Sequence, residues 1–194
     1  MFQIKYTAEE TNKVLTSRPS NQIFILNNIL SEDICEDISR YIDTNVKTEE
    51  KSFNCSTNVT AYGKILSVSD RHYNIIKSTI KNIAEYMYKK YAVETSCDSS
   101  ITLRKIYGAT KMHVDGPFNT GNENGIHRIM AVIICLNDDY EGGELFFPCQ
   151  NFKVKLKKGQ AILFPPFWTH PHRTNDLENN TFRYTITTWL CFHS

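Results

Sequence analysis

The sequence has no apolar run long enough to cross a membrane, no excess of charge of either sign, and no closely spaced pair of cysteines. A membrane-spanning helix needs about 18 or more consecutive apolar residues, so no transmembrane segment is expected. The 22 basic and 21 acidic residues leave a net charge of +1. This balance gives no reason to expect a nucleic acid or an anionic membrane surface as the main partner.

The six cysteines are scattered at positions 35, 55, 97, 135, 149 and 191, and no two of them form a C-x-x-C motif. The first residues, Met1–Lys5, lack the basic-then-apolar layout of a secretion signal. We therefore expect free thiols in a reducing compartment, and hence a cytoplasmic protein, rather than disulfides or a cysteine zinc site. Cys135 and Cys191 lie within apolar runs, which predicts that both are small core residues.

No internal repeat, low-complexity tract or glycine- and proline-rich linker divides the chain, so a single domain is expected over residues 1–194. Residues 1–98 are predicted to be helix-rich. Apolar residues at helical spacing indicate one helix from Ser31 through Ile42, with Ser31 as its N-cap, and a second from Ser69–Asp70 to about Tyr91. One or two short strands are expected between Val59 and Val68.

Residues 99–194 have a different pattern, in which short apolar or alternating runs are separated by turn residues. The expected strands cover residues 101–107, 128–136, 144–147, 152–156, 161–164 and 183–191. Many short strands after helices predict an α+β or mainly β fold, in the form of a sandwich, jelly roll or barrel with supporting N-terminal helices.

The sharpest local feature is His113-Val114-Asp115. Side chains two positions apart on an extended segment point the same way, so His113 and Asp115 can reach one ion together. An imidazole and a carboxylate, completed by a second histidine, form the facial triad that non-haem iron(II) oxygenases use. Alone, the motif is weak, because a solvated surface histidine and aspartate give the same pattern.

Three further segments strengthen the prediction. The first is the turn Glu141–Pro148 with its two glycines, and the second is the run Lys157–Pro165, which is followed by Thr169–Arg173 with two histidines. The third is the alternating strand Arg183–Leu190. A histidine and then an arginine on an alternating strand can place a metal ligand and a carboxylate anchor in one pocket.

In this order, the segments between Ile101 and Leu190 resemble the prolyl 4-hydroxylase branch of the iron(II)- and 2-oxoglutarate-dependent oxygenases. The resemblance implies a double-stranded β-helix (jelly-roll, cupin-like) core. It implies iron(II), 2-oxoglutarate and O2 as cofactors and co-substrates, with ascorbate as a reductant. The implied reaction is hydroxylation of a C–H bond, most naturally in a prolyl residue of a peptide or protein, with succinate and CO2 as products.

The same resemblance implies roles for individual residues. The metal ligands are His113, Asp115 and His172, while Arg183 binds the distal carboxylate of 2-oxoglutarate and Tyr107 adds a hydrogen bond to it. No further catalytic side chain is implied. The compact size resembles microbial or viral members of the family.

Some alternatives stay open. The residues alone allow His170 instead of His172 as the distal ligand, because the two lie two positions apart; the family spacing to Arg183 favours His172. The substrate could be a free amino acid or another small molecule, and the chain could be an inactive jelly-roll binding module. The loop Asn119–Gly125 is a candidate lid, whereas His127 and Arg128 are expected to be solvated groups at a strand end.

Overall fold

The computed structural model describes residues 22–46, 60–96, 99–116 and 126–193. These described residues form two α-helices, α2 (Glu32–Asn45) and α3 (Tyr73–Tyr91), one short 3-10 turn, η1 (Pro148–Gln150), and eleven β-strands. None of these helices is both long and apolar enough to span a membrane. The described cysteines, Cys35, Cys135, Cys149 and Cys191, are all free thiols.

The larger sheet has six antiparallel strands in the order β1-β8-β4-β11-β3-β2. They are β1 (Phe24–Leu26), β2 (Thr60–Ile65), β3 (Thr102–Tyr107), β4 (Ile126–Cys135), β8 (Ala161–Phe164) and β11 (Arg183–His193). The two strands from the N-terminal part, β1 and β2, form the two edges of this sheet. The helix-rich part expected over residues 1–98 therefore shares one sheet with the C-terminal strands.

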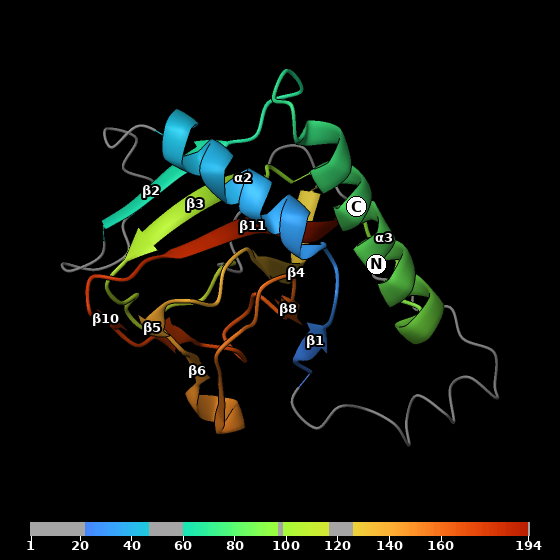
Figure 1. Ribbon diagram of the computed structural model, residues 1–194. Coiled ribbons are helices and arrows are strands. Elements are labelled where there is room, and N and C mark those ends of the chain that lie inside the picture. The colour runs from blue at the N-terminus through green and yellow to red at the C-terminus, as the bar shows by residue number, and fades with distance from the viewer. Residues whose placement is uncertain (1–21, 47–59, 97–98, 117–125, 194) are drawn as a thin grey trace.

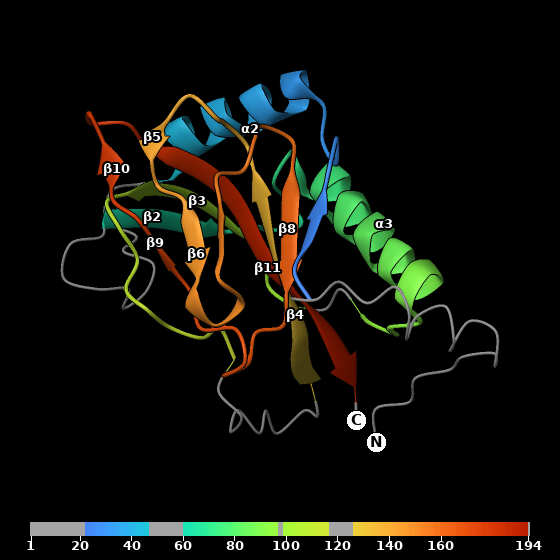
Figure 2. The same cartoon turned by 90° about the horizontal axis from the view of Figure 1, so that it is seen from below.

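Shorter strands form a second layer. The strands β7 (Phe152–Val154), β6 (Leu145–Phe147) and β9 (Arg173–Thr174) make a three-stranded sheet, and β10 (Leu177–Glu178) pairs with β5 (Glu141–Gly142). Figure 2 shows β5, β6, β9 and β10 at the left of the molecule, α2 along its top and α3 along its right margin. The described part is thus a two-layered antiparallel β structure with helices on its outer face.

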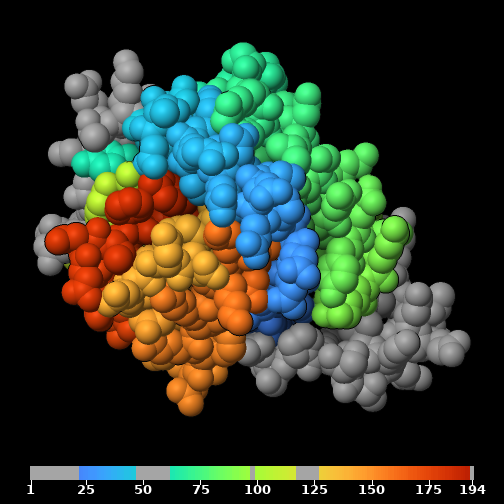
Figure 3. All heavy atoms as spheres, in the orientation of Figure 1, coloured from blue at the N-terminus to red at the C-terminus, as the bar shows by residue number. Residues whose placement is uncertain are grey.

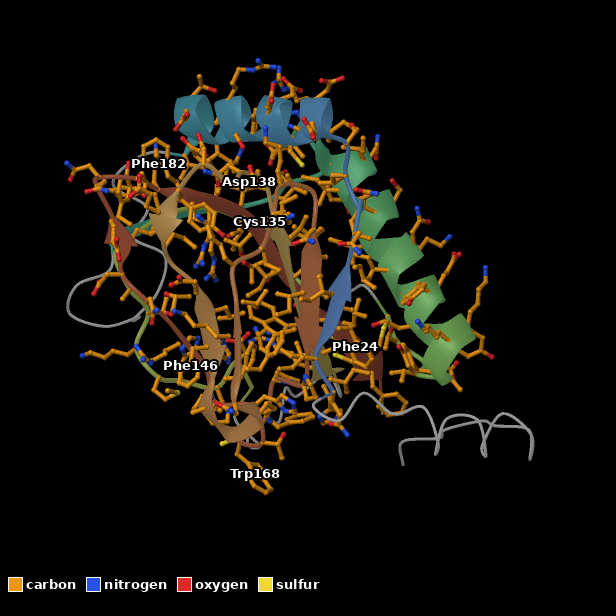
Figure 4. All side chains as sticks on the ribbon, turned by 60° about the horizontal axis from the view of Figure 1, so that its bottom comes forward. Phe24, Cys135, Asp138, Phe146, Trp168 and Phe182 are labelled. Atoms are coloured by element: carbon orange, nitrogen blue, oxygen red, sulfur yellow. The ribbon has the colours of Figure 1, made fainter. Side chains whose placement is uncertain are left out.

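Strict alternation along the central strands divides the interior into two cores. On β4, Met130, Val132 and Ile134 face the helices, whereas the intervening Ala131 and Cys135 belong to the core between the two β layers. Because both faces of this sheet are covered at its centre, β8 and residues 129–135 of β4 are apolar at every position. Cys135 and Cys191 are at most 1% exposed, which confirms that both are core residues; Figure 4 shows Cys135 among the strands.

Both predicted helices are present and pack on the outer face of the larger sheet. Helix α2 begins after Ser31, has Glu32 and Asp33 in its first turn, and buries Cys35, Ile38 and Ile42 along one side. Figure 1 shows α2 lying across β3 and β11, and Figure 3 shows the two helices as a continuous surface (blue to green) beside the C-terminal strands (orange).

Helix α3 begins at Tyr73, later than predicted from Ser69–Asp70. The carboxylate of Asp70 does not cap this helix, because it accepts hydrogen bonds from the Lys64 ammonium, the Tyr41 hydroxyl and the Ser67 backbone N–H. Burial of Asp70 opposes its ionisation, but these hydrogen bonds outweigh that effect and lower its pKa to about 2. The Asp70 cluster therefore ties α2 to β2 and to the segment before α3.

The low pKa of Asp70 predicts a pH-dependent contribution to stability. Its folded-state pKa of about 2 lies below the ordinary value of 3.8, so the stabilisation is complete above about pH 4 and is lost as the pH falls toward 2. We expect Asp70→Asn to lower the free energy of unfolding by about 2 kcal/mol at neutral pH. Urea unfolding at several pH values should show a smaller loss of stability between pH 4 and 2 in the variant than in the wild type. An equal loss in both would show that Asp70 is not responsible.

Candidate metal centre

Two histidines far apart in the sequence are joined by a backbone bridge. The N–H of His113 donates to the carbonyl of His172 at 2.9 Å, and the N–H of His172 donates to the carbonyl of His113 at 2.9 Å. Residues that exchange both backbone hydrogen bonds project their side chains to the same side of the pair. The two imidazole rings accordingly lie with their centroids 4.3 Å apart.

The carboxylate of Asp115 completes the cluster. Its Oδ1 atom lies 3.3 Å from Nε2 of His113 and 3.6 Å from Nε2 of His172. One potential ligand atom from each of the three residues lies within 4.8 Å of the other two. Two imidazoles and one carboxylate that converge on a point form the donor set of a non-haem iron(II) site.

Backbone carbonyls determine which nitrogen of each histidine faces the cluster. Nδ1 of His113 lies 2.7 Å from the carbonyl of Lys111, and Nδ1 of His172 lies 3.1 Å from the carbonyl of His170. A carbonyl only accepts hydrogen bonds, so Nδ1 carries the proton in both rings. The lone pair of each neutral ring is then on Nε2, which faces Asp115, as metal-ligating histidines require.

The charges of the three groups are also suited to a cation. Burial opposes ionisation of Asp115, but the hydrogen bond from His113 and nearby positive charges lower its pKa, so it is a carboxylate at neutral pH. Burial lowers the pKa of His172, which keeps its ring neutral. Burial also works to lower the pKa of His113, yet the hydrogen bond to Asp115 raises it overall. A metal ion would displace the proton that His113 shares with Asp115.

His170 lies outside this cluster. The N–H of His170 bonds to the carbonyl of Phe167 in a tight turn, and its Nδ1 lies 2.9 Å from the hydroxyl of Thr169. The group of potential ligand atoms that lie within 4.8 Å of one another includes His172 and does not include His170. Of the two open alternatives, His172 is the histidine that the structure brings to His113 and Asp115.

A cavity of about 260 Å³ runs from the cluster into the space between the two β layers. Its inner part is lined by Arg183, Thr185 and Tyr140 together with apolar side chains. Nε of Arg183 and the hydroxyl of Thr185 are buried and have no hydrogen-bond partner among the described residues. Unpaired buried donors are costly, and a carboxylate would satisfy both of them.

The two-glycine turn positions this arginine. Gly142 and Gly143 both have positive φ values, +67° and +68°, and a Cβ on Gly142 would lie 2.2 Å from the carbonyl oxygen of Asp176. Nη1 of Arg183 donates to the carbonyl of Gly143 at 2.7 Å. The two glycines are therefore required by the turn, and the turn holds the guanidinium at the inner end of the cavity.

Tyr107 is not brought to this cavity. Its ring packs against Tyr62 and Phe182, with centroids 5.9 and 5.6 Å away. On β3 the cavity is lined by Thr102, Arg104 and Ile106, so the odd-numbered Tyr107 points to the opposite face of the sheet. The expectation that Tyr107 binds the co-substrate is corrected by this alternation.

We therefore expect Tyr107→Phe to leave the dissociation constant of 2-oxoglutarate unchanged to within about twofold. The removed hydroxyl lies on the helix side of the sheet and cannot reach a ligand beside Arg183. Anaerobic binding of 2-oxoglutarate to the iron(II)-loaded protein measures this directly. If the affinity for 2-oxoglutarate fell tenfold or more, Tyr107 would have to contact the co-substrate after all.

Sequence reasoning missed several polar residues that line the cavity, among them Thr185, Arg104 and Arg128. Thr185 lies two positions after Arg183 on the same strand, and the alternation of that strand could have revealed it. Arg104 faces inward from β3. Arg128 was expected to be solvated; although exposed, it donates from Nη1 to the carbonyl of Asp115 at 3.1 Å, and its guanidinium stacks on Trp189. The candidate lid Asn119–Gly125 lies outside the described residues.

The fold and this donor set together define a jelly-roll protein with a two-histidine, one-carboxylate centre, and comparisons with known proteins agree. Residues 103–191 match the model of the 2OG-Fe(II) oxygenase superfamily. The chain is 25% identical over 166 residues to a prolyl 4-hydroxylase homologue of Acanthamoeba polyphaga mimivirus, which covers 76% of this chain and 62% of that protein. The chain thus spans less than two thirds of that relative.

Three solved structures share the fold. A Pseudomonas putida prolyl-4-hydroxylase has a TM-score of 0.71 at 11% identity, covering 94% of this chain and 98% of that chain. The collagen prolyl hydroxylase of Paramecium bursaria Chlorella virus-1, solved with 2-oxoglutarate, has a TM-score of 0.69 at 16% identity, covering 89% and 97%. A Trichoplax adhaerens prolyl hydroxylase, solved with a peptide of hypoxia inducible factor, has a TM-score of 0.68 at 18% identity, covering 96% and 94%.

These findings confirm the resemblance to the 2OG-Fe(II) oxygenase superfamily and, within it, to the prolyl 4-hydroxylase-like branch. They also confirm the fold class, a mainly β jelly-roll core with supporting helices. The cofactors of this superfamily are iron(II), 2-oxoglutarate and O2. The described residues fit them, because the cluster offers an iron(II) donor set and the inner cavity offers unpaired donors to a carboxylate.

Proposed function

We propose that this chain is an iron(II)- and 2-oxoglutarate-dependent dioxygenase that hydroxylates a prolyl residue in a peptide or protein. The observation that carries the proposal is the position of the His113, Asp115 and His172 cluster beside a cavity that contains Arg183 and Thr185. Metal donors and a carboxylate anchor in one cavity are what this chemistry requires. The family match and the prolyl hydroxylase folds support the same function.

In this proposal, Nε2 of His113, a carboxylate oxygen of Asp115 and Nε2 of His172 would hold iron(II). Arg183 and Thr185, whose buried donors have no partner among the described residues, would bind the distal carboxylate of 2-oxoglutarate. When bound, these groups supply the oxidative decarboxylation of 2-oxoglutarate by O2 to succinate and CO2, coupled to C–H hydroxylation, with ascorbate as a reductant of the iron.

The protein itself orients the metal-binding imidazoles and excludes water from the cavity. The Lys111 and His170 carbonyls hold both imidazoles with Nε2 toward the cluster. Leu145, Val154 and Leu156 give the inner cavity an apolar wall, which strengthens the interaction of Arg183 with a carboxylate. Burial raises the pKa of Tyr140, so its hydroxyl stays protonated and donates to the Leu156 carbonyl at 3.1 Å.

The substrate and the location in the cell belong to the proposal as well. The similar structures are those of prolyl hydroxylases, one of them in complex with a peptide, which favours a peptide or protein over a free amino acid. A cytoplasmic location is supported by the free thiols of the described cysteines, three of which are buried.

The test is to incubate the protein with iron(II), 2-oxoglutarate, ascorbate, O2 and a library of proline-containing peptides, with free amino acids in parallel. We expect succinate formation to depend on a peptide, and that peptide to gain one oxygen atom on proline by mass spectrometry. If only free amino acids stimulated turnover, the substrate would be a small molecule, and the reaction type would be unchanged. The absence of succinate under every condition would contradict the proposed function.

A further inference from the structure

Arg104 faces the cavity although the proposed binding of iron and 2-oxoglutarate does not use it. On the paired strands β3 and β11, Arg104 lies opposite Thr185, and Ile106 lies opposite Arg183. Arg104 and Arg183 are therefore diagonal neighbours on one face, a relation in which Cβ atoms lie somewhat less than about 7–8 Å apart. Arg104 lines the same cavity as His113 and Asp115, and its positive charge works to lower the pKa of both groups.

Arg128 brings a further positive charge to the outer part of the same cavity. Its guanidinium carbon lies 3.7 Å from the ring centroid of Trp189, and its Nη1 donates to the Asp115 backbone carbonyl. Neither contact neutralises its charge. Across residues 22–46, 60–96, 99–116 and 126–193, Arg128 forms no ion pair with a carboxylate.

The charges around the cavity are unequal. Among the described residues that line it, three are arginines (Arg104, Arg128 and Arg183) and one, Asp115, is acidic. In the proposed function, Arg183 is paired with the distal carboxylate of 2-oxoglutarate, and Asp115 is a metal ligand. The two other arginines line the same cavity as Thr102, Thr187 and Trp189, and the proposed binding of iron and 2-oxoglutarate leaves both of them available to a substrate. Positive charges with low-dielectric walls concentrate anions.

We infer that Arg104, assisted by Arg128, selects substrates that carry a carboxylate close to the carbon to be hydroxylated. This inference rests on the proposed function and narrows its substrate class. In a peptide, the carboxylate belongs to an aspartate or glutamate beside the proline. In free proline, it would be the α-carboxylate. Arg104 is a specificity-determining residue in this account, and it is not needed for binding iron or 2-oxoglutarate.

The test uses the full chain loaded with Mn(II) and 2-oxoglutarate, in which binding can be measured without turnover. The probes are end-capped fluorescent peptides that differ in having Asp, Asn or Lys next to one proline, with free proline as a competitor. We expect the Asp peptide to bind about tenfold more tightly than the Asn peptide. Arg104→Gln should bring the two affinities together, and Arg104→Glu should reverse the preference toward the Lys peptide. Arg40→Gln, which removes the same charge from the exposed surface of α2, should change nothing.

Competition by free proline that is lost in Arg104→Gln, without discrimination among the capped peptides, supports the same carboxylate recognition with the α-carboxylate as its source. Equal binding of the three peptides without competition by free proline overturns the inference, and so does the absence of binding by every probe. So does a weakening of 2-oxoglutarate binding in Arg104→Gln with the peptide preference intact, because Arg104 would then serve the co-substrate. The proposed function is judged separately, by the visible absorption of the iron(II)–2-oxoglutarate complex, which Arg104→Gln should retain.

Discussion

Replacing His172 with alanine is expected to abolish tight iron(II) binding and to lower succinate formation by more than about 100-fold. His172 supplies one of the three donor atoms. Its side chain is only 3% exposed, so a side chain on the surface cannot replace it as a ligand. Its backbone bridge to His113 does not need the side chain, and the fold should survive the change. Iron content after anaerobic loading and near-ultraviolet circular dichroism separate loss of metal from loss of structure.

His170→Ala is the matched control, because it removes the same side chain two residues away at a position that is equally buried. We expect this variant to bind iron(II) with an affinity within about tenfold of the wild type, since the backbone carbonyl of His170, which orients His172, is retained. If His170→Ala lost iron and His172→Ala kept it, the assignment of the distal ligand would be reversed.

Arg183→Gln should weaken 2-oxoglutarate binding by about 100-fold while leaving iron(II) binding intact. The change removes a charged donor from a partly buried site and leaves the distal carboxylate without a counter-ion, which typically costs about 2–5 kcal/mol. Thr185→Val should have a smaller effect of about tenfold, because it removes a single hydrogen bond to a charged group. The KM for 2-oxoglutarate and anaerobic binding to the iron-loaded protein measure both effects.

Arg183→Lys is the control that separates the effect of the positive charge from the effect of the two-donor geometry of the guanidinium. It keeps the positive charge but not the planar pair of donors, so its affinity should lie between those of the wild type and Arg183→Gln. An Arg183→Gln variant with an unchanged KM for 2-oxoglutarate would show that the carboxylate binds elsewhere, with Arg104 as the next cation in the cavity.

Much of the fold could be predicted because its main elements are long and periodic. The stripes of α2 and α3 and the apolar runs of β3, β4, β8 and β11 are all readable in the sequence. The strands β5, β9 and β10 have two residues each, which is too short for any periodicity. The start of α3 was displaced by a tertiary effect, since Asp70 is engaged by Lys64 and Tyr41 from other elements.

Site residues that are close together in the sequence could be predicted. Those whose position depends on tertiary contacts were harder to predict. The His113 and Asp115 pair follows from local spacing. The choice between His170 and His172 depended on a turn after Phe167, and spacing alone could not reveal it. Tyr107 was misplaced because β3 is covered on both faces, so its sequence does not indicate which face meets the cavity. The contact of Arg128 with the Asp115 carbonyl spans thirteen residues and is visible in the structure alone.

The most direct test of this account is anaerobic titration of the metal-free protein, first with iron(II) and then with 2-oxoglutarate, while visible absorption is recorded. The account predicts saturable binding of one iron, followed by a weak charge-transfer band when 2-oxoglutarate chelates it. The band should disappear in His113→Ala and His172→Ala and persist in His170→Ala. If the wild-type protein takes up no iron and gives no band, the jelly-roll fold stands but the oxygenase function proposed for it is wrong.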